Sequence, residues 1–182
     1  MSRFEQAMHY VVSTTKPDEL GKTKLAKVLF YADLEAFRRT GSTITESKYI
    51  KLPRGPVPQQ FYATIDNLAR EGKIAQKRQD LFGKEQHQFW STSAPDLSGL
   101  TAQDVALLSE VTKEICGNHT ASSISDLTHN AAWNCAEDNE EIPLSAFLVA
   151  SLQVEPTAAE LGFVISEIGR LDGLESAHAH VG

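Results

Sequence analysis

Apolar residues recur at helical spacing through most of the chain. The pattern predicts helices over residues 4–14, 22–40, 59–70, 122–128 and 145–152, with another that begins after residue 101. The apolar stripe is widest over 22–40, so that helix is predicted to be central to the core. Gly41 predicts its C-terminal end, because glycine adopts the left-handed conformation there without a side-chain penalty.

Short strand-like runs separate some of these helices. Residues 49–52 are read as one strand, and residues 73–77 and 87–91 as two strands of a loose hairpin. Residues 53–58, Pro-Arg-Gly-Pro-Val-Pro, predict a stiff loop, because three prolines and a glycine exclude a helix interior and a central strand.

These elements predict a mainly α (α+β) fold, a single helical domain with a small two- or three-stranded antiparallel sheet. The domain is expected over residues 1–155. A capping box at Thr157 predicts a C-terminal amphipathic helix over 156–172, and the small, polar residues 173–182 predict a disordered tail.

Composition places the chain among folded, soluble proteins. Hydrophobic residues make up 41% and charged residues 23%, which excludes a disordered chain and a disulfide scaffold. The sequence lacks a run of about 20 apolar residues and a secretory signal, so a cytoplasmic protein without a membrane span is expected. Cys116 and Cys135 are predicted to be reduced packing residues.

The net charge of -7 is unevenly distributed. Residues 1–92 hold 15 Lys and Arg against 10 Asp and Glu, whereas residues 93–182 hold 2 against 14. This asymmetry fits an anionic partner for the first half, a basic partner for the second half, or two solvated surfaces.

Motifs that carry catalytic or cofactor chemistry are missing from the sequence. It has no phosphate-binding glycine loop, nucleophile elbow or metal-binding H-E-x-x-H helix, and Cys116 with His119 completes no zinc spacing. The chain is therefore predicted not to be an enzyme and to bind no cofactor or metal. A helix followed by a basic hairpin also outlines a winged-helix DNA reader, but a pI of about 5.3 makes nucleic acid an unfavourable partner.

Asp33 interrupts an apolar run inside the most hydrophobic helix. A buried carboxylate requires water, a cation or backbone donors. The sequence favours a salt bridge to Lys51 or Arg54, beside the proline-rich segment.

Four segments in order resemble the Panacea domain, also called the SocA-like antitoxin domain: 24–33, with Lys-Val-Leu-Phe-Tyr-Ala-Asp at its end; 49–58, with Gly-Pro-Val; 68–74; and 127–133. The resemblance implies a mostly helical antitoxin of a two-gene toxin–antitoxin system, of the kind found in phage defence. Its partner would be a cognate protein toxin, and some members act as adaptors that deliver the toxin to a protease. Arg54 replaces the aromatic residue that the family commonly has before Gly-Pro-Val.

The predicted partner-binding residues combine amphipathic side chains with an acidic segment. They are Tyr31, Asp33, Lys51, Arg54, Trp133, Glu137, Asp138, Glu140 and Glu141. Large aromatic and guanidinium side chains carry binding energy at interfaces, although Tyr31 and Trp133 also fit roles in the core. The acidic segment is the first expected contact for a basic toxin. The toxin's identity, the oligomeric state, and the choice between occlusion and delivery to a protease stay open.

Overall fold

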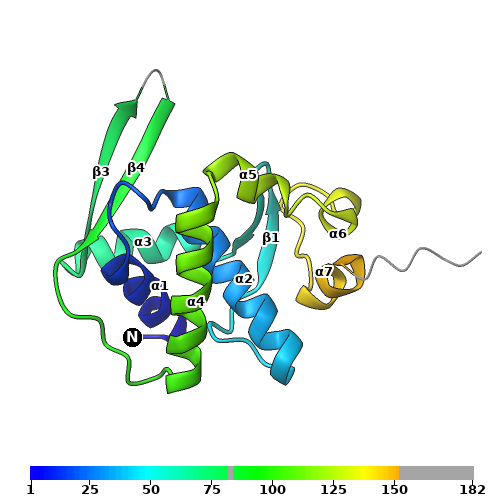
Figure 1. The fold of residues 1–182 in the computed structure, drawn as a ribbon, viewed down its shortest axis with the longest axis horizontal. Coiled ribbons are helices and arrows are strands. Elements are labelled where there is room, and N and C mark those ends of the chain that lie inside the picture. The colour runs from blue at the N-terminus through cyan, green and yellow to red at the C-terminus, as the bar shows by residue number, and fades with distance from the viewer. Residues whose placement is uncertain (82–83, 152–182) are drawn as a thin grey trace, which may run out of the picture. The chain divides into compact units, whose positions relative to one another are not determined.

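The computed structural model describes residues 1–81 and 84–151 (Figure 1). In chain order these ranges hold α1 (Arg3–Thr14), α2 (Lys22–Thr40), β1 (Tyr49–Leu52), β2 (Gly55–Pro58), α3 (Phe61–Arg70), β3 (Ile74–Leu81), β4 (Lys84–Ser91), α4 (Ala102–Asn118), α5 (Ala121–Asp126), α6 (Ala131–Cys135) and α7 (Leu144–Ser151). The mainly α fold class is confirmed. The predicted boundary at residue 155, helix 156–172 and tail 173–182 lie outside the described residues.

Helix α2 is central to the unit that covers residues 1–151. It packs against α1, α4, α5 and α7 and against β2 (Figure 1). Leu25, Val28 and Leu29 on its apolar stripe are fully buried. Gly41 ends the helix with a φ of 75°, and its N–H donates to the Phe37 carbonyl at 2.8 Å. The sequence pattern predicted this helix and its end correctly.

The strands form two separate antiparallel pairs, β1–β2 and β3–β4. Within residues 53–58 the prediction of a loop is wrong for Gly55–Pro58, which pairs with Leu52–Tyr49. Both strands of a two-stranded sheet are edge strands, so prolines without an N–H are tolerated there. Strands β3 and β4 are longer than the predicted runs, and the hairpin extends away from the helices (Figure 1).

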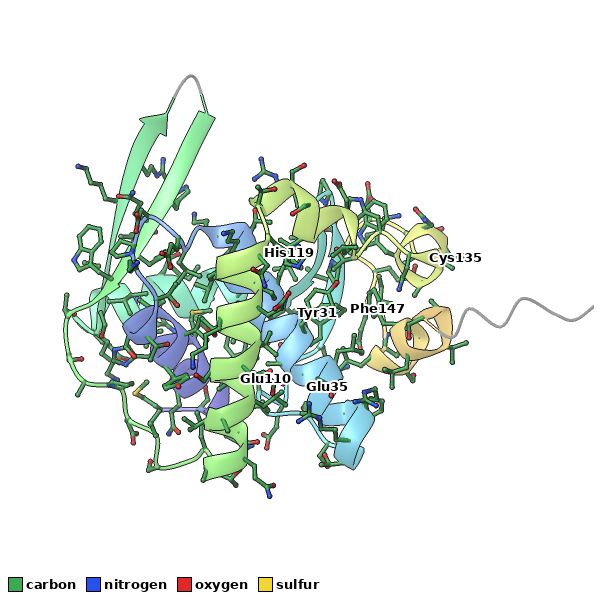
Figure 2. The ribbon with its side chains drawn as sticks, viewed as in Figure 1. Tyr31, Glu35, Glu110, His119, Cys135 and Phe147 are labelled. Atoms are coloured by element: carbon green, nitrogen blue, oxygen red, sulfur yellow. The ribbon has the colours of Figure 1, made fainter. Side chains whose placement is uncertain are left out.

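The core consists of two clusters. The larger one joins apolar side chains of α1, α2, α3 and α4, and the smaller one is formed by Phe30, Tyr49, Ile142 and Phe147. Phe30 makes edge-to-face contacts with Tyr49 at 5.3 Å and with Phe147 at 4.8 Å between ring centroids. Figure 2 shows Phe147 beside α2, on α7. The smaller cluster therefore anchors the C-terminal part of the described chain.

Helix α6 was missed by the sequence pattern. It has five residues and no buried side chain, so it leaves no apolar stripe, although the Asn130 side chain caps it by accepting from the Trp133 N–H. Cys135 at its end is exposed, which corrects its prediction as a packing residue. Cys116 is buried, as predicted.

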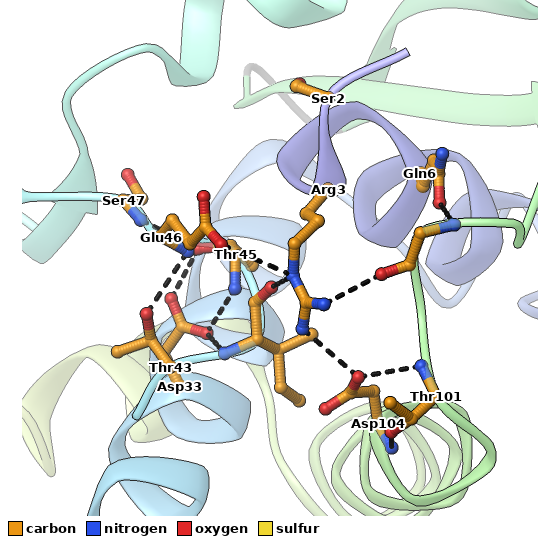
Figure 3. Close-up of polar contacts among 12 residues, drawn as sticks. Ser2, Arg3, Gln6, Asp33, Thr43, Thr45, Glu46, Ser47, Thr101 and Asp104 are labelled. Carbon is orange, nitrogen blue, oxygen red and sulfur yellow. Dashed lines mark hydrogen bonds and ion pairs between the residues drawn. The ribbon is translucent and has the colours of Figure 1, made fainter. Parts of the chain in front are cut away.

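Arg3 connects three segments that are distant in sequence (Figure 3). Its guanidinium donates to the carbonyls of Ile44 and Gly99, both at 2.8 Å, and to the Asp104 carboxylate at 3.1 Å. Such charge-assisted hydrogen bonds are stronger than neutral ones. They hold the segment before β1 and the start of α4 against α1.

Candidate functional site

Asp33 lies in the interior and is the acceptor of a dense hydrogen-bond network (Figure 3). Its side chain is 0% exposed, and Oδ1 accepts from the N–H groups of Ile44 at 2.8 Å and Thr45 at 2.9 Å. Oδ2 accepts from the Tyr49 hydroxyl at 2.7 Å and from the Thr45 hydroxyl. Burial raises the pKa of Asp33, against the hydrogen bonds from Thr45 and Tyr49, which lower it.

The predicted salt bridge of Asp33 with Lys51 or Arg54 is wrong. Lys51 Nζ donates to the Ala136 carbonyl at 2.9 Å, and Arg54 Nη1 to the Thr23 hydroxyl at 3.3 Å. The chain after α2 folds back over Asp33 and supplies backbone donors in place of a cation. A partner could therefore reach Asp33 only if residues 43–45 moved.

Lys27 is a second buried charged group on α2, and sequence reasoning missed it. It is 0% exposed, and Nζ donates to the Pro56 carbonyl at 3.0 Å. Burial lowers the pKa of Lys27 to about 7. The sequence does contain a signal for this buried lysine: Lys27 interrupts the apolar run Leu25–Phe30, just as Asp33 interrupts an apolar run further along the same helix.

Gly55 allows β2 to approach this lysine closely. Its φ is +94°, and a Cβ at this position would lie 2.1 Å from the Thr128 hydroxyl oxygen and 2.4 Å from Lys27 Nζ. Both the backbone conformation and the space therefore require glycine. The Ser125 hydroxyl donates to the Arg54 carbonyl at 2.7 Å, which fixes α5 to the same hairpin.

Lys51 and Trp133 come together at the surface beside β1. Lys51 Nζ lies 4.3 Å from the centroid of the Trp133 ring, and Trp133 Nε1 donates to the Leu52 carbonyl at 3.2 Å. His129 stacks on Trp133, with centroids 4.0 Å apart and an angle of 20° between the planes. A cation, an imidazole ring and a backbone carbonyl thus all contact the half-buried Trp133, which restricts its position.

The acidic turn, residues 137–141, is exposed and attached to β1 through its backbone. The Lys51 N–H donates to the Glu140 carbonyl at 2.9 Å, and the Asn139 N–H donates to the Lys51 carbonyl at 3.0 Å. Lys48 pairs with Glu141 at 2.9 Å, whereas no cation among the described side chains, those of residues 1–78 and 87–151, pairs with Glu137 or Asp138. The structure therefore brings Lys51, Trp133 and the acidic turn together, while Arg54 is exposed on the turn between β1 and β2.

A groove of about 270 Å³ lies between α2, α4 and α5. We call it the α2–α4 groove. Figure 2 shows Tyr31 and Glu35 on α2, Glu110 on α4 and His119 directly after the end of α4. The groove is lined by Tyr31, Glu35, Glu110, Val111, Glu114, Ile115, His119, Ile124 and Leu127. Tyr31 is the one predicted partner-binding residue in this lining, and burial raises its pKa.

The glutamates of the α2–α4 groove were not singled out in the sequence. Their signal is spacing: Glu110 and Glu114 are four residues apart and so share one face of α4. Hydrogen bonds from Arg38 and Arg39 to Glu35, at 2.6–2.7 Å, lower the pKa of Glu35 to about 2. Arg38 and Arg39 lie on α2 with Glu35, so the charge of Glu35 is compensated within that helix.

Among the described side chains, those of residues 1–78 and 87–151, no group of three or more His, Cys, Asp or Glu is arranged to hold a metal ion. In the same ranges, every helix is too short or too polar to cross a membrane.

Comparisons with known proteins gave one finding. The family model described as antitoxin SocA-like, Panacea domain, matches residues 25–134, more than half of the 182 residues. No curated protein and no solved structure matched significantly. The matched range contains most of α2, the β1–β2 hairpin, α4, α5 and Trp133, and it ends just before the acidic turn.

Proposed function

The chain belongs to the SocA-like antitoxin family of Panacea domains, and we propose that it neutralises a cognate protein toxin by binding it directly. The family supports an antitoxin role in general, with a protein as the partner. Direct, stoichiometric binding in the cytoplasm, within a two-gene toxin–antitoxin system, is the step that we add. The chain would then act by contact and without chemistry of its own.

The observation that carries this proposal is the rigid presentation of exposed acidic side chains. Backbone hydrogen bonds to β1 hold the acidic turn in place, while Glu137 and Asp138 have no cationic partner in the described part of the chain. A surface that is already ordered loses little entropy on binding. Unpaired charges of one sign attract a partner of the opposite sign and accelerate its association.

This surface favours a toxin with a basic contact face. Such a face is typical of proteins that act on ribosomes, tRNA or mRNA, because phosphate groups dominate the affinity for nucleic acids. The stacked Lys51–Trp133 pair lies next to the acidic turn and offers a partner a fixed aromatic edge.

Co-expression with the protein encoded beside its gene tests the proposal. We expect the neighbouring protein to be toxic alone, harmless with this chain, and recovered with it as a complex from the same cells. Rescue of growth without a complex would contradict direct binding and would point to delivery to a protease or to repression. If the neighbouring protein is harmless when expressed alone, it is not a toxin, and this result would contradict the proposal that the chain neutralises it.

The contribution of the acidic turn is tested by association kinetics. Replacement of Glu137, Asp138, Glu140 and Glu141 by their amides should slow association with the toxin and flatten its dependence on salt. The matched control replaces Asp18, Glu46, Asp66 and Glu71, which lie outside both the turn and the α2–α4 groove and change the net charge equally. Kinetics unchanged by the first variant, or slowed equally by both, would contradict a role for the turn.

A further inference from the structure

The floor of the α2–α4 groove is apolar and ends in an exposed leucine. Val111, Ile115 and Ile124 line it, and Leu127 at its edge is 59% exposed. Exposed apolar side chains that continue an apolar depression mark sites where another protein docks. The volume of about 270 Å³ lies just below the range of about 300–1000 Å³ that is typical of small-molecule sites. The size therefore favours a few inserted side chains over a cofactor.

The rim of the groove carries excess negative charge. Glu110 and Glu114 are both exposed and stand one turn apart on α4, an arrangement of like charges that destabilises a helix. The Asn118 amide donates to Glu114 at 2.8 Å, and His119 lies 3.7 Å from it. Glu110 has no hydrogen-bond or ion-pair partner among the described side chains, those of residues 1–78 and 87–151.

The contrast with Glu35 shows what the rim requires. Glu35, at the same groove, is satisfied by two arginines of its own helix. An arginine or lysine placed between Glu110 and Glu114 would compensate both carboxylates and remove their mutual repulsion. The negative charge of the rim therefore favours a partner segment with a cationic side chain. The apolar floor favours a segment that also carries apolar side chains.

The chain's own C-terminal segment is a poor occupant on the same criterion. Residues 152–182 contain one basic side chain, Arg170, against five acidic ones. An acidic rim would repel such a segment, whereas a basic partner protein would be attracted.

We infer that the α2–α4 groove binds an amphipathic, basic segment of the toxin, with apolar side chains on Val111, Ile115 and Leu127 and an arginine or lysine between Glu110 and Glu114. This inference rests on the proposed function, since it names the surface that the toxin occupies. If apolar and basic side chains recur three or four residues apart in a helix of the toxin, one face of that helix can supply both kinds of contact.

The experiment measures the dissociation constant between the full 182-residue chain and the purified protein encoded beside its gene. The double variant Glu110→Arg, Glu114→Arg should weaken binding by about 10- to 100-fold, and Leu127→Ser by about 10-fold. The isosteric pair Glu110→Gln, Glu114→Gln should weaken it less than the reversal does. The sites are exposed, so the melting temperature should change little.

Matched controls separate local contacts from overall charge and exposure. Asp18→Arg with Asp66→Arg makes the same change in net charge outside the groove, and Val149→Ser removes an apolar side chain that is 68% exposed on α7. Both controls should bind as the wild type does.

The other outcomes each overturn the inference in a recognisable way. If the wild type binds the neighbouring protein and the groove variants bind it with the same affinity, the groove is not the binding site. The proposed function would then still stand. Equal losses in groove and control variants would show a nonspecific charge effect. Absence of binding by the wild type would overturn both proposals. A dimer in sedimentation that the groove variants dissociate would assign the groove to self-association.

Discussion

Asp33 lies on the central helix α2 and Glu110 on the neighbouring helix α4, and the surroundings of these two carboxylates are opposite. Asp33 is fully buried and accepts four hydrogen bonds from Ile44, Thr45 and Tyr49. Glu110 is exposed at the rim of the α2–α4 groove, without a partner in the described residues. A carboxylate that the fold has satisfied holds the fold together, whereas one left unsatisfied beside apolar surface is available for binding.

The largest expected effect is on the buried side of this comparison. Asp33→Ala should lower the free energy of unfolding by about 4 kcal/mol, because it leaves two backbone N–H groups and the Tyr49 hydroxyl buried without acceptors. Glu110→Ala should change it by less than about 0.5 kcal/mol. Urea denaturation of both variants measures the difference, and comparable losses would refute the division between structural and binding carboxylates.

A smaller loss of stability is expected from a substitution at Gly55, where the backbone of β2 approaches the buried Lys27. Gly55→Ala should cost about 3 kcal/mol, because it combines a positive φ with overlap on Thr128 and Lys27. Gly41→Ala is the matched control: its φ is +75°, nothing lies within 4 Å of its Cβ position, and a loss of about 1 kcal/mol is expected. Equal thermal destabilisation of the two variants would show that the close approach at Gly55 is unimportant.

The buried lysine should make stability depend on pH. Between pH 7 and 9 the unfolded chain keeps Lys27 protonated, while the folded chain, with the pKa of Lys27 lowered to about 7, progressively loses this proton. The free energy of unfolding should therefore rise with pH through this group, by about 2 kcal/mol over that range. Lys27→Met abolishes this contribution, and the difference between wild type and variant isolates it from other titrating groups.

The measurement is chemical denaturation of wild type and Lys27→Met at pH 7 and pH 9. The free energy of unfolding of the wild type should increase relative to that of Lys27→Met as the pH rises from 7 to 9. An equal change in both proteins would mean that Lys27 keeps its proton in the folded state, held by the Pro56 carbonyl.

Features set by local sequence were predictable, and those set by tertiary contacts were not. The apolar stripe of α2, its end at Gly41 and the start of α4 after residue 101 depend on neighbouring residues and were predicted. The exposure of the acidic turn followed from its composition.

Strand β2 was hidden by its prolines, which are tolerated only because its single neighbour is β1. The partners of Asp33 lie 11 to 16 residues away in the chain, and no local pattern selects backbone donors over a cation. The α2–α4 groove unites residues from Tyr31 to Leu127, so only the folded chain brings them together. Lys27 was within reach of sequence reasoning by the criterion already applied to Asp33, and so was the shared helix face of Glu110 and Glu114 by their spacing.

Hydrogen–deuterium exchange of the full chain, with and without the purified protein encoded beside its gene, tests the central claim most directly. Direct binding of the toxin to the α2–α4 groove and to the acidic turn predicts slower exchange in α4, α5 and residues 137–141, with little change in the buried α1. Protection confined to the β3–β4 hairpin, or none anywhere at concentrations that neutralise the toxin, would contradict the account.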